Sequence, residues 1–298
     1  MSSNMSSNMS SNAPKKSFVP HPSKEKLDRE KARLKAEKFI PERGDKFESF
    51  ISGLLEKWAR LPLPKIKEYL AHIKIFEQAF TSKSIDEKWN YEALEMIGDS
   101  VANHCVVYYI SQRFPELMAD DGSQVWIIAR LKINLVSKEV FAHCAKQLGF
   151  GEHIASDLYT RSTEMESLLE DTFEAFHGAL FRITQLIEPA SNRVGYIPTT
   201  GPSYRVIQAY LDTINISLRR EDLVDAKSRL KEAADVLGFG APVIKTSERA
   251  DENNRIIFRS VVLFPGKTGE YGCGGGTTKA ESIRDACENA IRNLDLGK

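Results

Sequence analysis

The sequence predicts an all-α domain followed by a small α+β domain of α-β-β-β-α order. Three observations support this prediction. Apolar residues recur at helical spacing almost throughout residues 45–187. Proline and glycine gather in residues 188–222, which predicts a linker with one short helix around Tyr204–Ile214. Strand-like runs then lie between two helical segments in residues 223–298.

The N-terminal part of the chain is polar and highly charged. Residues 1–22 begin with three copies of Met-Ser-Ser-Asn, and this low-complexity tail is predicted to be disordered. Residues 23–44 are predicted as a charged helix and linker, in which Ser23 opens a helix that runs to Lys38. This helix is typical of a solvated surface element, and contact with anionic phosphates is the alternative.

Composition limits the class of protein. The chain has 41 basic and 41 acidic residues, so its net charge is zero. No apolar run approaches the roughly 18 residues of a membrane span. The beginning of the sequence lacks the apolar core of a signal peptide, so we expect an intracellular protein, cytoplasmic or nuclear, that is not secreted. The four cysteines show no Cys-x-x-Cys spacing and are interpreted as ordinary thiols rather than zinc ligands.

Two acidic clusters lie on helical, otherwise apolar segments. Glu92, Glu95 and Asp99 fall at i, i+3 and i+7, so their carboxylates project from one face of a helix. Asp171 and Glu174 do the same on a second helix. Like charges on partly buried helices repel, which favours a bound cation, and oxygen ligands alone favour Mg²⁺ or Mn²⁺. Two helices with acidic, solvated faces are the alternative.

The same segments resemble the signature motifs of the ribonuclease III family, which cuts double-stranded RNA. Tyr91–Val101 resembles the first family motif, roughly N-E-R-L-E-F-L-G-D-[AS]-V. Leu169–Phe181 resembles the second, roughly L-A-D-x-[FV]-E-A-[LI]-x-G-A-[IVL]-[FY]. The two motifs stand in the family's order at the family's separation. We therefore expect the first domain, residues 45–187, to have the ribonuclease III fold.

Two positions depart from the family pattern. A short family element, L-T-H-x-S, stands here as Phe80–Ser84, with Ser82 in place of the histidine. His177 stands where the family usually has an aliphatic residue, and we interpret it as a packing substitution. Neither departure removes a metal ligand that the resemblance implies.

The resemblance implies a mechanism and a set of site residues. The catalytic and metal-binding residues are Glu95, Asp99, Asp171 and Glu174, with Mg²⁺ as the cofactor and Mn²⁺ as a possible substitute. Glu92 matches a position associated with RNA contact or the dimer surface. The family acts as a homodimer and leaves 5′-phosphate and 3′-hydroxyl ends by two-metal hydrolysis. The alternatives are a non-cleaving double-stranded-RNA-binding or scaffold protein on the same fold, and a protein that sequesters double-stranded RNA.

The C-terminal part, residues 223–298, resembles a double-stranded-RNA-binding domain. Its predicted elements are a helix at Asp225–Leu237, strands at Val243–Ser247 and Ile256–Phe264 with a turn at Glu252–Asn254, a glycine-rich segment at Tyr271–Gly276, and a helix at Lys279–Leu294. The residues that the resemblance assigns to RNA contact are Lys231, Glu232, Lys279 and Arg284.

This second resemblance is incomplete at the positions that contact phosphates. Ala280 and Ile283 occupy two of the three positions that are basic in the family. Residues 221–298 contain 12 basic and 13 acidic residues, so the region is not basic overall. We therefore expect the fold with only modest RNA affinity, and a protein-contact module is the alternative.

Overall fold

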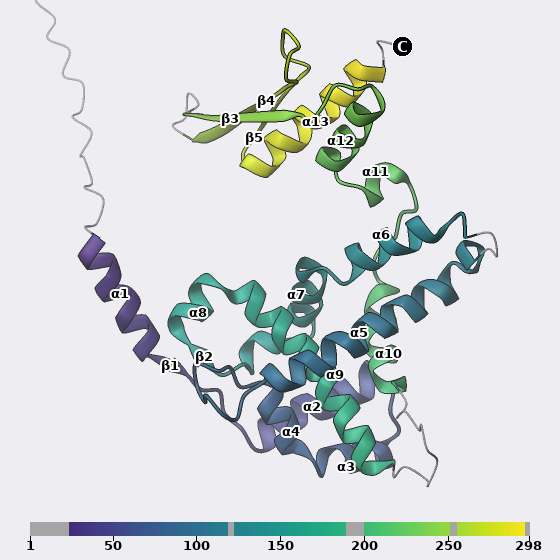
Figure 1. Cartoon of the computed structure of the whole chain (residues 1–298). Coiled ribbons are helices and arrows are strands. Elements are labelled where there is room, and N and C mark those ends of the chain that lie inside the picture. Colours follow the sequence, from purple (N-terminus) through teal and green to yellow (C-terminus); the bar gives the residue numbers. More distant parts are fainter. Residues whose placement is uncertain (1–23, 119–121, 189–199, 251–254, 296–298) are drawn as a thin grey trace, which may run out of the picture.

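The structure is a computed structural model that describes residues 24–118, 122–188, 200–250 and 255–295. A helical domain is followed by a small α+β domain, as Figure 1 shows, and this confirms the predicted fold class. The low-complexity tail and the turn predicted at residues 252–254 lie outside the described residues.

The helical domain is built from α-helices of 6 to 23 residues with short 3₁₀ turns and one two-stranded ladder. Its helices are α1 (Lys24–Ala36), α2 (Asp45–Lys57), α3 (Leu63–Leu70), α4 (Ile73–Ala79), α5 (Glu92–Arg113), α6 (Val125–Leu135), α7 (Lys138–Gln147), α8 (Leu158–Thr163), α9 (Met165–Ile187) and α10 (Gly201–Leu211). The 3₁₀ turns are η1 (Pro115–Met118) and η2 (Phe150–Glu152). None of the described helices is both long enough and apolar enough to cross a membrane.

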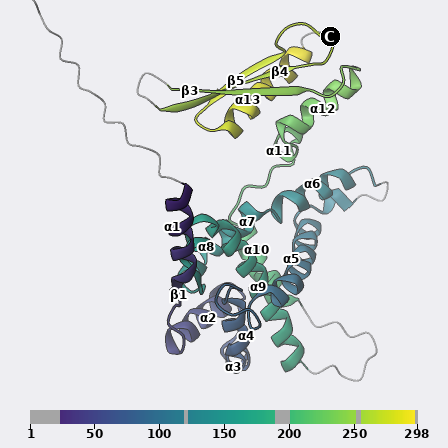
Figure 2. The same ribbon diagram turned by 60° about the vertical axis from the view of Figure 1, so that its left-hand side comes forward.

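Helix α9 is the centre of the helical domain. It packs against α5 on one side and α7 on another, and α3 and α4 also contact it (Figure 2). The apolar positions of α9 recur at helical spacing, so Phe173 and Phe176 are both buried. Phe176 meets Phe150 and Phe76 at ring-centroid distances of 5.4 and 5.7 Å. This aromatic core fixes the position of α9 and of the acidic residues that it carries.

The N-terminal helix ends earlier than the sequence predicts. Helix α1 stops at Ala36, and Lys38–Phe39 form strand β1, which pairs antiparallel with β2 (Ser156–Asp157). The Lys38 ammonium donates to the carbonyl oxygen of Ser84 at 2.6 Å. Pairing with β2 therefore replaces the last helical turn. Helix α1 itself has no buried residue, as expected for a solvated surface helix.

The segment predicted as a linker contributes to the helical core. Helix α10 covers most of the short helix predicted at Tyr204–Ile214, and it packs against α5. Its apolar side chains Val206, Ile207, Tyr210 and Leu211 are buried in the same core as α5 and α9. The segment packs as part of the core, rather than acting as a linker, because one face of this short helix is apolar. An amphipathic helix is stable only when its apolar face packs against another element. A one-turn helix, α11 (Arg220–Leu223), then leads to the second domain.

The second domain has the predicted order of elements. Helix α12 (Ala226–Val236) is followed by β3 (Val243–Ala250), β4 (Ile256–Leu263), β5 (Gly272–Gly276) and α13 (Lys279–Asp295). The strands form an antiparallel sheet of order β3-β4-β5 that packs on α13 (Figure 2). The glycines of β5 allow this contact, because a Cβ on Gly272 or Gly274 would lie 2.3 or 2.2 Å from the backbone of Ala286.

His177 is fully buried on α9, and neither of its ring nitrogens has a hydrogen-bond partner. Burial lowers its pKa to about 3, so the ring stays neutral in the folded protein. The predicted packing role therefore agrees with its position. A buried polar group without a hydrogen-bond partner costs free energy, so His177 lowers the free energy of unfolding of the protein.

We expect His177→Leu to raise the free energy of unfolding by about 1 kcal/mol or more. The folded-state pKa lies below the unfolded value near 6.5, so the wild type has its full stability above pH 6.5 and loses it progressively toward pH 3. His177→Leu should lose less stability over that range in urea unfolding at several pH values. The exposed His143→Leu is the control, and an equal pH response in both variants would contradict the prediction.

Candidate metal centre and nucleic-acid interface

Helices α5 and α9 touch backbone to backbone at two glycines. A Cβ on Gly98 would lie 1.7 Å from the carbonyl oxygen of Glu174, and one on Gly178 would lie 2.0 Å from that of Leu94. Only glycine fits at such distances. Because Glu95 and Glu174 stand beside these glycines, the helix crossing brings the acidic faces of the two helices together.

The four predicted ligands share one electrostatic environment. Burial, followed by repulsion from Asp171, raises the pKa of Glu95 to about 7. Burial, followed by repulsion from Asp99, raises the pKa of Glu174 to about 8. Burial also raises the pKa of Asp171. Carboxylates so perturbed by burial and by one another stabilise a bound cation, so the donor set fits a divalent metal ion.

Each aspartate of the site has a neighbouring hydrogen-bond donor. The Tyr91 hydroxyl donates to Asp171 Oδ2 at 3.1 Å, and the Asn103 amide donates to Asp99. Within the described residues, no three Asp, Glu, His or Cys side chains converge closely enough to hold a metal ion. Two of the four carboxylates, those of Asp99 and Asp171, are thus hydrogen-bonded to protein donors.

The segment Phe80–Ser84 supports the start of α5. The Thr81 carbonyl accepts from the backbone N–H of Tyr91 at 2.9 Å, and the Ser82 N–H donates to the Ala155 carbonyl at the same distance. Lys83 forms an ion pair of 2.9 Å with Glu92. Thr81 and Lys83 therefore hold the N-terminal turn of α5, whereas Ser82 bonds to Ala155 through its backbone and to Ser84 through its hydroxyl.

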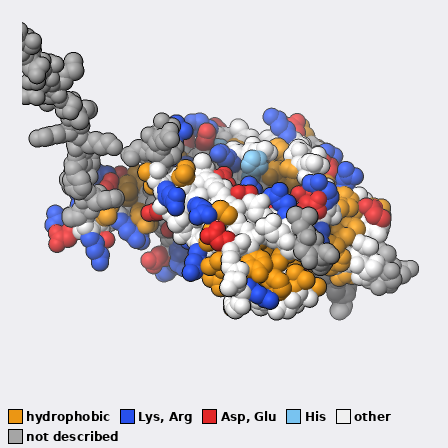
Figure 3. Space-filling model, turned by 90° about the horizontal axis from the view of Figure 1, so that it is seen from above, with side chains coloured by type: hydrophobic (Ala, Val, Ile, Leu, Met, Phe, Trp, Pro, Cys, Tyr) orange, Lys and Arg blue, Asp and Glu red, His pale blue; other side chains and the backbone are white. Residues whose placement is uncertain are grey.

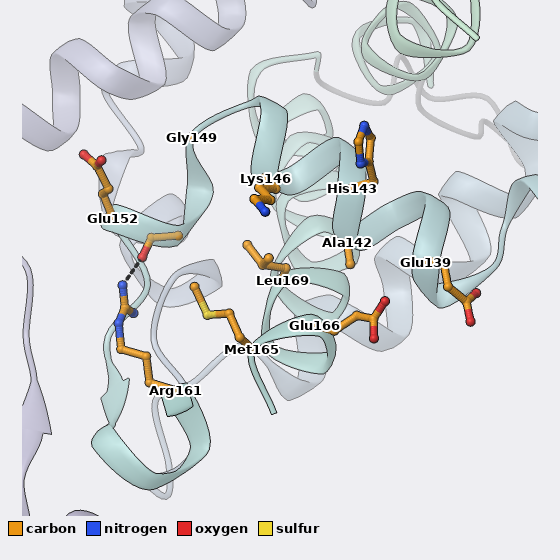
Figure 4. A pocket seen from close by; sticks show the side chains of 11 residues that line it. Glu139, Ala142, His143, Lys146, Gly149, Glu152, Arg161, Met165, Glu166 and Leu169 are labelled. Carbon is orange, nitrogen blue, oxygen red and sulfur yellow. Dashed lines mark hydrogen bonds between the residues drawn. The ribbon is translucent and has the colours of Figure 1, made fainter. Parts of the chain in front are cut away.

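A pocket of about 740 Å³ lies beside the acidic site, between α7, α8 and the first turn of α9. Figure 4 shows Met165 and Leu169 among its lining side chains, with Lys146 and Arg161 close by. Arg161 donates to the carbonyl oxygens of Gly151 and Ile154, which fixes its guanidinium. None of the four predicted ligands lines this pocket, so it is separate from the candidate metal centre.

Comparison with known sequences identifies the family of this chain. Residues 92–182 match the Ribonuclease III domain family. A putative ribonuclease 3 of Invertebrate iridescent virus 6 is 31% identical over 274 residues, which are 87% of this chain and 90% of the relative. The chain belongs to the ribonuclease III family. It is therefore a double-stranded-RNA endoribonuclease, a hydrolase, and this confirms the predicted family and enzyme class.

Other ribonuclease III relatives match shorter parts of the chain. A putative ribonuclease 3 of Frog virus 3 is 39% identical over 163 residues, 54% of this chain and 42% of the relative. Ribonuclease 3 of Methylococcus capsulatus is 35% identical over 223 residues, 74% of this chain and 88% of the relative. A solved nuclease domain of Campylobacter jejuni ribonuclease III covers 54% of this chain and 96% of that domain, at a TM-score of 0.40 and 22% identity.

The residues that the resemblance to a double-stranded-RNA-binding domain assigns to RNA contact differ in their surroundings. Lys231, Lys279 and Arg284 are exposed, whereas Glu232 forms ion pairs with Arg220 at 2.6 Å and Arg130 at 4.0 Å. Figure 3 shows basic side chains interspersed with acidic and apolar ones on the face seen there. Modest RNA affinity of the second domain stays a prediction, in keeping with this mixed surface.

The start of α13 is occupied by one of its own carboxylates. Glu281 Oε2 accepts from the Thr277 and Thr278 N–H groups at 2.9 and 3.2 Å, and the Glu281 N–H donates to Thr278 Oγ1 at 3.1 Å. This capping box satisfies the N–H groups of Thr278 and Glu281, which a phosphate at the helix start could otherwise use. The hydrogen bonds from Thr277 lower the pKa of Glu281, so the group is a carboxylate at neutral pH.

We expect Glu281→Gln to strengthen duplex RNA binding by about threefold to tenfold, because it removes a negative charge from the helix N-terminus. Fluorescence anisotropy with a labelled duplex in EDTA would measure the effect. Asp235→Asn in the last turn of α12 likewise removes one negative charge, away from this helix end, and serves as the control. Equal affinities of the two variants would contradict the prediction.

Sequence reasoning missed several residues that surround the carboxylates. Tyr91 and Asn103 bond to them, and Glu170 lies next to Asp171 in a salt bridge with Lys138. Glu170 could have been noticed in the sequence, because it places a carboxylate where the second family motif has alanine. No spacing in the sequence pointed to Lys138, which comes from a different helix.

Proposed function

We propose that this chain hydrolyses phosphodiesters of double-stranded RNA with divalent ions held by Glu95, Asp99, Asp171 and Glu174, leaving 5′-phosphate and 3′-hydroxyl ends. Mg²⁺ is the expected ion, and Mn²⁺ can replace it, since the donors are carboxylate oxygens alone. When bound, such ions activate water and offset charge on the phosphate and on the leaving oxygen. The observation that supports this most strongly is the glycine-mediated contact of α5 and α9, the two helices that carry the family motifs.

The chain's own residues prepare the site. Tyr91 and Asn103 orient the carboxylates of Asp171 and Asp99 through their hydrogen bonds. Glu95 and Glu174 have pKa values of about 7 and 8, so both hold protons for part of the time near neutral pH. Both carboxylates must lose these protons to hold a divalent cation, so the affinity of the site for such ions should increase with pH.

A labelled RNA duplex incubated with the protein tests this function. Cleavage in Mg²⁺ that stops on addition of EDTA, with 5′-phosphate on the products, is the expected result. A shifted but uncut duplex would instead favour the non-cleaving binding, scaffold or sequestering protein.

We further propose that the active form is a homodimer. The chain carries one pair of acidic motifs, and a duplex presents two strands, so a two-fold dimer would supply one site for each strand. Helix α5 exposes three large apolar side chains beside or beyond the acidic site. They are Met96, Val107 and Tyr108, with Met96 78% exposed between Glu95 and Ile97. A second copy of the chain would cover this apolar surface.

Met96→Gln should weaken the dimer by at least about tenfold, because an apolar side chain at an interface is replaced by a polar one of similar length. Sedimentation equilibrium over a range of protein concentrations would measure the change. Val236→Gln is the matched control, since Val236 is 81% exposed but lies on α12. A dimer of unchanged affinity in Met96→Gln would exclude this surface.

A further inference from the structure

A third helix brings a cation to the edge of the acidic site. Lys138 is the first residue of α7, and its ammonium lies 2.7 Å from Glu170 Oε2 and 3.1 Å from Ser167 Oγ. Both partners belong to α9, one and four residues before Asp171. The contact therefore joins α7 to the part of α9 that carries the predicted ligands.

Glu170 is an additional carboxylate of this site. Its side chain is only 17% exposed, and its charge contributes to the raised pKa values of both Glu95 and Glu174. Burial raises the pKa of Asp171, whereas the charge of Lys138 acts in the opposite direction. Lys138 therefore offsets the charge of Glu170 within reach of the predicted ligands.

The Lys138 ammonium is held in place but still accessible. An ammonium has three N–H donors, and the contacts with Glu170 and Ser167 use two of them. The Lys138 side chain remains 44% exposed. A third donor is thus available to an anion that approaches the acidic site from solvent.

We propose that Lys138 contacts a non-bridging phosphate oxygen of the RNA backbone beside the acidic site, with Glu170 and Ser167 holding the ammonium in position. This inference rests on the proposed function, because the anion is the RNA substrate. A site lined with carboxylates repels phosphates, so a fixed cation at its edge would position the duplex against that repulsion.

Duplex binding in the Glu174→Gln background, where cleavage should be at least about 10²-fold slower, tests the contact directly. Lys138→Met should raise the Kd by about tenfold and reduce the slope of log K against log salt by about 0.9. Lys138→Arg should retain most of the affinity. In single-turnover cleavage with Glu174 intact, Lys138→Met should raise the half-saturating enzyme concentration by about tenfold, with the rate at saturation changed by less than about threefold.

The double variant Lys138→Met/Glu170→Gln distinguishes phosphate contact from simple charge compensation. If Lys138 contacts RNA, the double variant should bind as weakly as Lys138→Met, with the same reduced salt slope. Recovery of wild-type affinity and slope would show that Lys138 only neutralises Glu170, and would overturn the proposal. Wild-type protein that fails to cut RNA in Mg²⁺ would contradict the proposed function, while these binding comparisons would still decide the role of Lys138.

Discussion

Glu174→Gln is expected to reduce the single-turnover cleavage rate of double-stranded RNA by at least about 10²-fold while leaving duplex binding within about twofold. The substitution preserves size but replaces a carboxylate oxygen by an amide nitrogen, which repels a cation. A loss of 10² corresponds to about 2.7 kcal/mol of transition-state stabilisation, a typical effect of removing a group that acts on the reacting atoms.

The matched control is Glu166→Gln on the same helix. Glu166 lies on the face of α9 that lines the separate pocket, and the same chemical change there should leave cleavage within about threefold. Cleavage by Glu174→Gln at the wild-type rate, with saturating protein and Mg²⁺, would contradict the proposed metal centre.

Gly98→Ala is expected to destabilise the folded protein by more than about 3 kcal/mol, and to abolish cleavage in any protein that remains folded. The added methyl group would lie 1.7 Å from the Glu174 carbonyl oxygen and 2.8 Å from the backbone nitrogen of Gly178. Both atoms are backbone, so no side-chain rotation relieves the overlap. Helices α5 and α9 would have to separate, and their carboxylates would separate with them.

Gly53→Ala provides the control for this substitution. Gly53 lies within α2, and a Cβ there meets no atom within 4 Å. Alanine is the better helix former, so Gly53→Ala should stabilise the protein by about 0.5–1 kcal/mol. Thermal and urea unfolding would measure both variants. Equal unfolding midpoints for Gly98→Ala and wild type would show that the two helices do not meet in this way.

The sequence predicted the acidic faces because helical periodicity fixes which side chains of one helix point together. Glu95 with Asp99, and Asp171 with Glu174, follow directly from their spacing. The contact of Tyr91 with Asp171 joins the start of α5 to α9 and depends on packing that no spacing fixes. The bond from Asn103 to Asp99 lies within α5 at i, i+4, so the spacing allowed it but did not fix the rotamers that form it.

Two features that were not predicted, the capping of α13 and the packing of α10, are nevertheless indicated by local sequence patterns. The series Thr278-x-x-Glu281 is a capping box, and it indicated that the start of α13 would be occupied by its own carboxylate. The apolar residues of α10 likewise indicated a packed helix rather than a linker. By contrast, the pairing of Lys38 with strand β2 joins residues more than 100 positions apart, and local sequence patterns carry no such information.

Glu232 connects two parts of the molecule, since its carboxylate pairs with Arg220 before α12 and with Arg130 on α6. A duplex that used Glu232 to reach a ribose hydroxyl would have to compete with these guanidinium groups. The ion pair between Glu232 and Arg130 and engagement of RNA at this residue would thus compete with each other. Ionic strength would shift the balance between the two, because it weakens the exposed ion pairs.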